Sequence, residues 1–331
     1  MPDGFIVTVI KSFALVNMVM LVFALMTWIE RRLIGRFQVR YGPNRVGPGG
    51  VLQPIADLGK LLRKESIIPA GSSPVLYLAA PAVSLFASLA VFGVIPFGEQ
   101  ATIPFTDWKI FLYIADVNVA LLLIFALGSF SFYGFLVGGW ASRSKYSLYG
   151  SMRAVAQLVS YEVALTMAVI GVVMMSQSLS LIGIVQAQER DGIWYIVPQF
   201  AGFVIYLLAS TAEVSRIPFD LPEAEGELVA GYHTEYGGMR WAMYQNAEFV
   251  ATIAFSALAS ILFLGGYDGP FLPGPVWMLL KMALFLFLMI WIRSTLPRVR
   301  YDRLMIIGWK VLLPAATLNL LVTAAVVVWV D

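Results

Sequence analysis

The chain has 331 residues, of which 60% are hydrophobic and only 13% are charged. A soluble domain carries roughly a quarter charged residues, so this composition excludes a water-soluble globule. The 22 Lys and Arg nearly balance the 20 Asp and Glu, and a net charge of +2 excludes the broad basic surface that nucleic-acid binding requires.

Along the chain, eight apolar segments are long enough to cross a membrane, which takes about 20 residues as a helix. The first segment lacks a preceding basic region, so we interpret it as a retained span rather than a signal peptide. Tryptophans near many of the ends are typical of the aromatic belts at membrane interfaces. We therefore predict an all-α integral membrane protein, a single polytopic domain over residues 1–331. The expected spans are 5–29, 74–97, 111–138, 152–177, 193–212, 241–264, 273–291 and 304–330.

The loops after the odd-numbered spans, with their flanks, hold 18 of the 22 Lys and Arg. By the positive-inside rule, these loops face the cytoplasm or its equivalent, and both termini lie on the outer side.

The first of these loops covers residues 30–73 and has internal structure. The Gly and Pro residues within 41–50 interrupt any helix there. After them, the apolar residues Val51, Ile55, Leu58 and Leu62 recur at helical spacing. Pro54 suits a first helical turn. We predict a short amphipathic helix that lies in the membrane surface.

Glu162, Glu248 and Lys281 are charged residues placed deep within expected spans. Glu162 lies near mid-span, where an acid costs at least about 2.5–3.5 kcal/mol, so we expect it to face the protein interior or a proton path. Glu248 has a similar position, whereas Lys281 has a long stem that can reach the interface. The alternative for the acids is a structural carboxylate bonded to a Ser or Tyr of a neighbouring helix.

A second loop, residues 213–240, is strongly acidic. Pro218 and Pro222 exclude one uninterrupted helix. Clustered carboxylates raise one another's pKa and can accept protons, although a charge run is more often a solvated surface. Glu213 and Arg216 are three residues apart and can form an ion pair on one helix face. From the spacing alone, a structural salt bridge explains this pair as well as a proton-accepting role does. The acids of this loop are Glu213, Asp220, Glu223, Glu225, Glu227 and Glu235.

The residues of common redox centres are missing. The absence of Cys excludes disulfides and Cys-ligated iron–sulfur clusters, and His233 alone cannot form a multi-His metal site. No GxGxxG follows a strand and no GK[ST] closes the glycine-rich stretch. We therefore expect no bound metal or cofactor, with any redox step on a partner or a diffusible substrate. Two classes fit: an ion-coupled transporter, or a membrane subunit that docks soluble partners.

Several long strings resemble the NuoH-type heel subunit of respiratory complex I, the proton-translocating NADH:quinone oxidoreductase. The resemblance extends over nearly the whole chain, and strings of this length are far more specific than a short motif. They are ERR at 30–32, FQVRYGPNRVGP at 37–48, LQPIAD at 52–57, GWAS at 139–142, RAVAQ at 153–157, SYE at 160–162, PFDLPEAE at 218–225, ELVAG at 227–231, WIR at 291–293 and RVRYD at 298–302.

The resemblance implies a subunit that forms part of a quinone chamber and couples quinone reduction to proton translocation, with quinone as substrate. It assigns chamber and entrance roles to Arg31, Arg36, Arg45, Asp57, Lys60, Arg216, Asp220, Arg293 and Arg298. It assigns the proton path and coupling to Glu162, Glu213, Glu223, Glu225, Glu227, Glu235 and Glu248. Some relatives carry an acid in the third span, whereas this chain has Ser129, Phe130 and Ser131 there, so the proton route either has one fewer carboxylate or uses water and Ser131 instead.

The implied partners are peripheral-arm subunits that carry the terminal iron–sulfur cluster and the quinone-headgroup ligands, together with small and antiporter-like membrane subunits. Quinone and the lipid bilayer complete the set, without nucleic acid. The implied location is an energy-transducing membrane, the bacterial inner membrane. A related membrane subunit of an energy-converting hydrogenase or of another donor dehydrogenase is the alternative within the family, and a stand-alone ion-coupled transporter is the alternative from another class.

Overall fold

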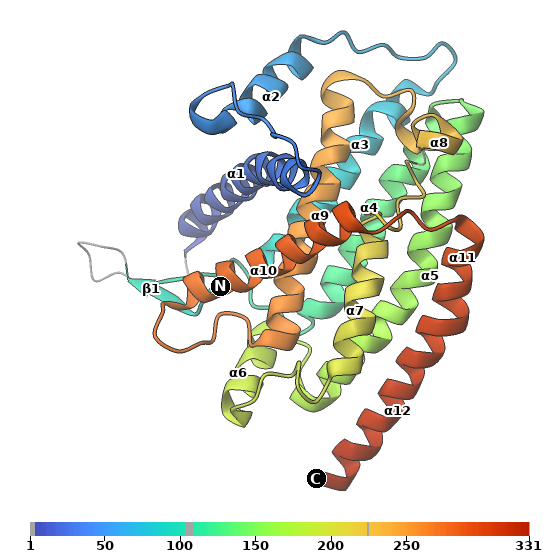
Figure 1. Ribbon diagram of the computed structural model, residues 1–331. Helices are drawn as coiled ribbons and strands as arrows, with labels where there is room; N and C mark the ends of the chain where they lie inside the picture. The colour runs from blue at the N-terminus through green and yellow to red at the C-terminus, as the bar shows by residue number, and fades with distance from the viewer. Residues whose placement is uncertain (1–3, 103–108, 224, 331) are drawn as a thin grey trace.

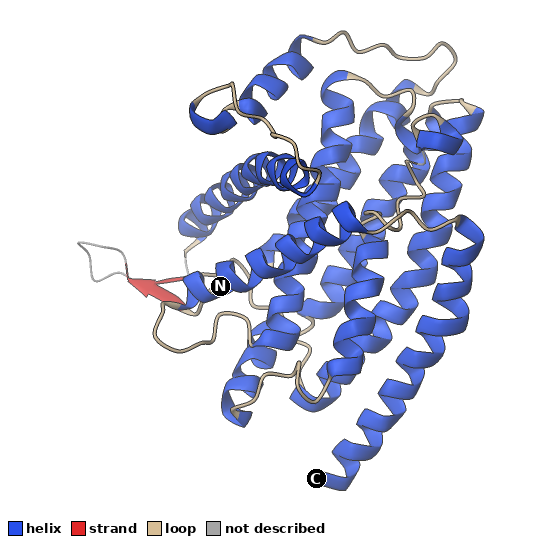
Figure 2. Ribbon diagram, viewed as in Figure 1, coloured by secondary structure: helices blue, strands red, loops and turns tan. Residues whose placement is uncertain are grey.

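The computed structural model describes residues 4–102, 109–223 and 225–330, and helices dominate that part of the chain (Figures 1 and 2). Seven helical segments are long and apolar enough to cross a membrane, and an eighth apolar helix, α7 (Phe200–Glu213), is shorter. The prediction of a polytopic all-α membrane protein is confirmed. The long segments are α1 (Phe5–Phe37), α3 (Pro74–Ala90) with the 3-10 turn Val91–Gly93, α4 (Ala120–Ala141), α5 (Lys145–Ser176), α9 (Gly238–Leu264), α10 (Gly274–Thr295), and α11 (Tyr301–Ile306) joined through the π-helical turn Ile307–Leu312 to α12 (Leu313–Val330).

The helices form a bundle around α9. In Figure 1, α3, α4, α5, α7, α9 and α12 run from top to bottom, whereas α1 and α10 cross them at a steep angle. In the most apolar stretch of α9, 89% of the residues are buried, whereas in that of α1 the share is 6%. A helix that is apolar on all sides is expected at such a central position. Any polar side chain on the inner part of α9 is therefore held in the protein interior.

Two predicted spans begin later than expected. Phe111 does not start a helix, because β2 (Lys109–Phe111) pairs antiparallel with β1 (Gln100–Thr102), and α4 begins only at Ala120. The fifth span, expected from residue 193, begins at Phe200 as α7. Pro198 disfavours helical geometry in the residue before it, which explains the turn that precedes α7. With 14 residues, α7 is about 21 Å long, shorter than the other spans.

The first helix is longer than its apolar run. α1 continues through the charged residues 30–36 to Phe37, so Glu30 and Arg31 lie on a helix rather than in a loop. The predicted amphipathic helix is confirmed as α2 (Gln53–Arg63), with Pro54 in its first turn. In Figure 1, α2 lies beside the C-terminal end of α1, at the upper end of the molecule.

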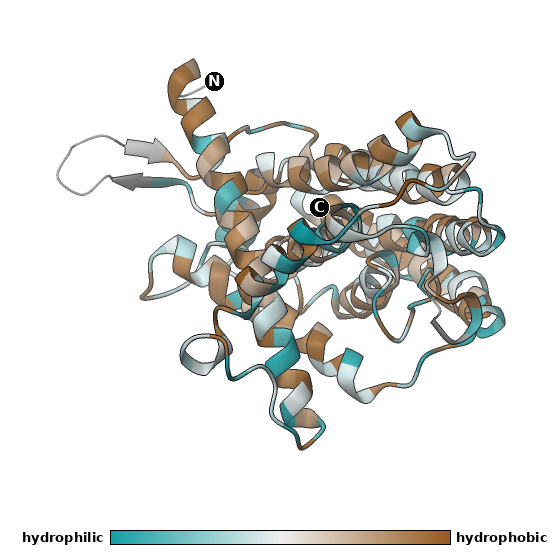
Figure 3. Ribbon diagram, turned by 90° about the horizontal axis from the view of Figure 1, so that it is seen from above, coloured by the Kyte–Doolittle hydropathy of each residue, from teal (hydrophilic) through white to brown (hydrophobic). Residues whose placement is uncertain are grey.

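The acidic loop lies at the same end as α2. It contains the short helix α8 (Glu225–Leu228) and the 3-10 turn Gly231–His233, and Pro218 and Pro222 lie outside both, as predicted. The helix α6 (Leu181–Asp191) and the C-terminus lie at the opposite end (Figure 1). Seen from above, most helical turns are hydrophobic, and hydrophilic residues gather mainly in loops and at helix ends (Figure 3).

Candidate functional site

A charged pocket lies between α1, α2 and α9. Its empty volume is about 930 Å³, part of which is open to solvent. Its lining combines apolar and aromatic side chains with charged groups from four separate parts of the chain. The charged pocket is lined by Phe23, Thr27, Glu30, Arg31, Ile34, Pro54, Asp57, Leu58, Leu61, Arg216, Trp241, Ala242, Gln245, Asn246, Phe249 and Arg293.

A three-residue ion cluster forms the floor of this pocket. Glu30 of α1 is buried, and its Oε1 accepts a hydrogen bond from the Arg293 guanidinium at the end of α10. Nη1 of Arg216 lies 3.6 Å from the same oxygen, and its guanidinium carbon lies 4.0 Å from the ring centroid of Phe249. Because a buried ion is costly unless it is paired, these contacts fix α1, α10 and the acidic loop relative to one another.

A second ion pair holds α2 against α1. Nη1 of Arg31 lies 2.5 Å from Oδ2 of Asp57, and the Gln53 amide donates to the other carboxylate oxygen at 2.8 Å. Partial burial opposes ionisation of Asp57, but the hydrogen bonds from Arg31 and Gln53 outweigh it and lower the pKa of this carboxyl. Asp57 is therefore a carboxylate at neutral pH. Lys60 lies 3.8 Å away on the solvent side.

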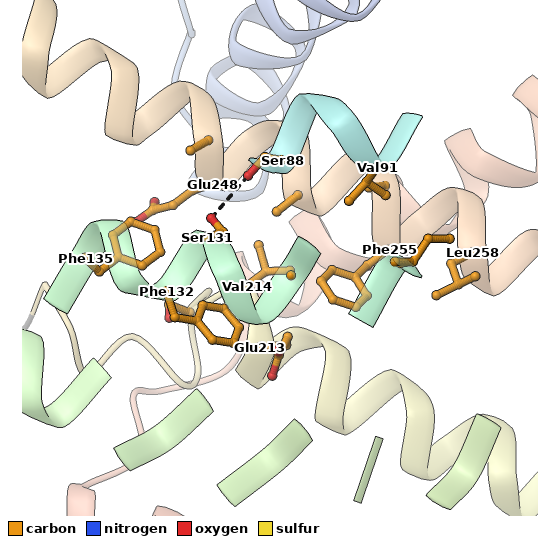
Figure 4. A pocket seen from close by; sticks show the side chains of 16 residues that line it. Ser88, Val91, Ser131, Phe132, Phe135, Glu213, Val214, Glu248, Phe255 and Leu258 are labelled. Carbon is orange, nitrogen blue, oxygen red and sulfur yellow. Dashed lines mark hydrogen bonds between the residues drawn. The ribbon is translucent and has the colours of Figure 1, made fainter. Parts of the chain in front are cut away.

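A second pocket, here called the inner pocket, lies deeper in the bundle, between α3, α4, α7 and α9 (Figure 4). Its empty volume is about 630 Å³. The carboxyl groups of Glu213 and Glu248 line it from different helices, and most other lining side chains are apolar. The hydroxyl of Tyr232 donates to Oε1 of Glu248 at 2.7 Å. Oε2 of Glu213 is buried and finds no hydrogen-bond partner in the described part of the chain.

Glu162 lies close to this region without lining either pocket. It is half-buried on α5, and the hydroxyl of Ser129 on α4 donates to its Oε1. The structure therefore provides the Ser partner that the structural interpretation of Glu162 requires.

The environments of Asp220 and Glu227 in the acidic loop shift their pKa values in opposite directions. Burial and the negative charge of Glu223 raise the pKa of Asp220 to about 6, against the opposing effect of nearby arginines. Glu223 accepts a hydrogen bond from Gln245 of α9 at 2.9 Å. The hydrogen bond from Arg153 of α5 lowers the pKa of Glu227, and these two groups lie 2.5 Å apart.

The remaining members of the predicted set lie farther from the pockets. Glu235 is exposed, and its backbone carbonyl accepts from the Tyr77 hydroxyl at 2.7 Å. Glu225 begins α8, and its side chain lies outside the described part of the structure. Arg36, Arg45 and Lys60 are exposed and do not line the charged pocket, and Arg298 is half-buried. Their assignment to a chamber entrance stays a prediction.

The pairing predicted between Glu213 and Arg216 is wrong. α7 ends at Glu213, so the two side chains do not share a helix face, and Arg216 pairs with Glu30. The long stem of Lys281 carries its ammonium to the end of α9. Its ammonium is buried and donates to the carbonyl oxygens of Leu264, Gly266 and Asp268 at 2.5–2.9 Å, where α9 ends.

Sequence reasoning missed three contributors. Glu30 belongs to the Glu30-Arg31-Arg32 run, which ends an apolar segment and so resembled an ordinary membrane anchor. Tyr232 and Gln245 carry no charge, and only the fold brings them to Glu248 and Glu223. The one signal in the sequence was the position of Glu30, an acid next to a series of arginines, because a basic membrane anchor does not need an acid there.

Together the fold and pockets define a polytopic helical membrane protein with a charged chamber at one end and buried carboxyl groups below it. Among the described residues, no group of three or more His, Asp and Glu could hold a metal ion. A family model described as NADH dehydrogenase matches residues 10–324, and the chain belongs to that family.

Similar proteins span nearly the whole chain, and all three described here are named as subunits of NADH-quinone oxidoreductase. The one from Syntrophobacter fumaroxidans is 49% identical over 98% of this chain and 97% of its own length. The one from Thermomicrobium roseum is 48% identical over 98% of this chain and 97% of its own length. The one from Thermus thermophilus is 47% identical over 98% of this chain and 88% of its own length.

Proposed function

We propose that this chain is the membrane subunit of a proton-translocating NADH:quinone oxidoreductase that forms part of the quinone chamber and couples quinone reduction to proton movement. Full-length relatives that are named as subunits of NADH-quinone oxidoreductase support this function. The chain contributes no redox centre and binds quinone as a substrate. Electrons reach that quinone from an iron–sulfur cluster of a partner subunit.

The observation that carries the coupling role is the short connection between the two pockets. Glu213 ends α7 in the inner pocket, and Arg216 lies three residues later in the charged pocket. Reduction of a quinone draws protons and changes the local charge. A change at Arg216 and Glu30 is therefore transmitted over a few backbone bonds to the carboxyl of Glu213.

The charged pocket suits the headgroup side of a quinone chamber. Its aromatic lining residues, Phe23, Trp241 and Phe249, accommodate an apolar ring and tail. Its other lining residues supply cations and hydrogen-bond donors. Most small-molecule sites have this combination of apolar surface and a few placed polar groups. We assign the chamber to Arg31, Asp57, Arg216 and Arg293, and the proton path to Glu162, Glu213 and Glu248.

The polar end of the bundle, with α2, α8 and the acidic loop, is the surface for peripheral-arm subunits. The apolar flanks contact lipid and the small and antiporter-like membrane subunits. The excess of Lys and Arg in the loops at this end supports a cytoplasmic orientation, with both termini outside, in a bacterial inner membrane.

Two experiments on the purified complex test the proposal. A photoreactive quinone is expected to label residues 31–64 or 213–240 of this chain, and labelling confined to other subunits would contradict the chamber. Glu213→Gln and Glu162→Gln are expected to reduce proton pumping in proteoliposomes, with Glu189→Gln at an exposed position of α6 as the control. Assembled variants that keep full pumping and full quinone reduction would contradict the proton path.

The same preparation separates the alternatives. Reduction of its iron–sulfur centres by NADH supports the dehydrogenase, whereas reduction by hydrogen gas would support the hydrogenase-type relative. Solute or ion movement by the isolated chain in liposomes would support a stand-alone transporter. The names of the relatives favour neither alternative.

A further inference from the structure

The inner pocket has two acids and a small set of hydroxyls. Glu248 lines it from α9 and Glu213 from the end of α7. The other polar side chains among its lining residues are Ser88, Ser131 and Ser215, and the remainder are Gly, Ala or larger apolar residues. A proton that passes between the two carboxyl groups therefore has few protein groups on which to move.

Ser88 of α3 and Ser131 of α4 form a buried pair across the pocket wall. Their Oγ atoms lie 3.4 Å apart, and the two side chains point toward each other (Figure 4). In that view, the pair lies beside Glu248, and Glu213 lies farther along the same pocket. Both serines are more than nine-tenths buried.

The hydroxyl of Ser131 has two alternative acceptors. Its Oγ lies 3.3 Å from the carbonyl oxygen of Ser84 and 3.4 Å from Oγ of Ser88. Both distances are longer than the roughly 2.7–2.8 Å of a strong O–H···O hydrogen bond. Ser88 donates to the carbonyl oxygen of Ser84 at 2.9 Å, so its Oγ remains an acceptor. The proton of Ser131 can therefore rotate between partners at little cost.

Glu213 supplies an independent indication that the pocket holds water. Oε2 of Glu213 is buried and has no hydrogen-bond partner in the described residues, although the side chain is 6% exposed and lines the pocket. A buried carboxyl oxygen without a donor is costly, and buried waters typically satisfy such groups. The space in the pocket that the centre of a water molecule can occupy is about 50 Å³, more than the roughly 10–15 Å³ that one buried water requires.

We propose that the Ser88–Ser131 hydroxyl pair orders water in the inner pocket and relays protons between Glu248 and Glu213. The relay rests on the proposed proton-path function, adds Ser88 to it and gives Ser131 a defined position in it. Ser131 accepts a proton through water on the Glu248 side as its own proton passes through water to Oε2 of Glu213. One proton leaves the Glu248 carboxyl, one arrives on the Glu213 carboxylate, and the serine is unchanged.

The test uses the assembled complex in proteoliposomes, with proton pumping and quinone reduction measured together. Ser131→Thr and Ser131→Val form a matched pair, because threonine and valine have nearly the same shape and only threonine keeps the hydroxyl. We expect Ser131→Val to lower pumping about tenfold or more, as for loss of a proton-transfer group. Ser131→Thr is expected to retain pumping. Equal pumping by the two variants would overturn the relay.

Two further measurements keep the test decisive. Ser88→Ala removes the other hydroxyl of the pair with little change in volume, and it tests the relay if the Ser131 variants do not assemble. Ser256→Ala on α9 is the control, because the Ser256 hydroxyl donates to the carbonyl of Thr252 outside the pocket. A high-resolution map of the complex is expected to show water within hydrogen-bond distance of Oε2 of Glu213 and Oγ of Ser131, and a dry pocket would overturn the relay.

Failure of the relay and failure of the proposed function give different results. If Glu213→Gln and Glu248→Gln abolish pumping while Ser131→Val and Ser88→Ala retain it, only the serine relay is wrong. If both Glu→Gln variants also retain full pumping, the proton path itself is wrong.

Discussion

Glu213 and Arg216 are three residues apart, yet their side chains line different pockets, one inside the bundle and one in the charged chamber near its polar end. The separation follows from the end of α7 at Glu213, after which the chain turns and directs Arg216 toward Glu30 and Phe249. A short backbone segment thus joins the substrate side of the protein to its buried acids.

The ion cluster at Glu30 predicts a stability effect. Glu30→Gln leaves Arg216 and Arg293 without their shared carboxylate in a largely buried setting. Removal of one partner of a buried ion pair costs about 3 kcal/mol. We expect a lower thermal unfolding temperature and weaker quinone reductase activity. Glu65→Gln, at an exposed position, is the control and should leave both unchanged. Wild-type stability of Glu30→Gln would show that the cluster does not hold the three segments together.

The contact between Arg31 and Asp57 predicts an effect on substrate entry rather than on folding. These side chains are partly exposed, so Asp57→Asn should change stability by less than about 1 kcal/mol. Because the ion pair holds α2 against α1, its loss should raise KM for a long-tailed quinone with little change in kcat. Arg63→Gln, which removes an exposed cation from the same helix, is the control. An equal rise in KM for both variants would argue against a specific role of the ion pair.

Asp220 predicts a pH dependence. Burial and Glu223 raise its pKa to about 6, so the folded protein disfavours the charged form. The wild type should therefore lose stability relative to Asp220→Asn as pH rises from the ordinary Asp pKa near 4 to about 6, with a constant difference above that. Thermal unfolding across this pH range measures the effect. Infrared difference titration should show a carboxyl with a midpoint near pH 6 that is absent from the variant, and an unchanged titration would contradict the assignment.

Lys281 predicts a purely structural effect. Its ammonium bonds three carbonyl oxygens at the end of α9 and lies 4.9 Å from the ring centroid of Trp194. Lys281→Met leaves buried acceptors unpaired, at a cost of about 1–3 kcal/mol. We expect lower thermal stability with an unchanged ratio of protons pumped to quinone reduced. Lys145→Met, at an exposed position, controls for loss of a positive charge. A changed ratio would instead place Lys281 on the proton path.

Local patterns predicted most of the helices. The apolar runs around α3, α5 and α9 are long, and the spacing of Val51, Ile55, Leu58 and Leu62 is strong enough to predict α2. Segment starts were less predictable. Phe111 belongs to a hairpin because its backbone pairs with Gln100, and such pairing depends on a partner 11 residues away rather than on the run itself.

The sequence by itself determined the class of the protein. High apolar content dictates helices in a membrane, where backbone groups must bond within their own segment, and the loop charges dictate which end is polar. It also indicated Glu162, Glu213 and Glu248 as unusual buried acids. Only the tertiary structure decided their partners. Ser129, Ser131, Tyr232 and Glu30 acquire roles because helices distant in sequence bring them within hydrogen-bond reach, and the strength of an interaction in a low-dielectric interior depends on that distance.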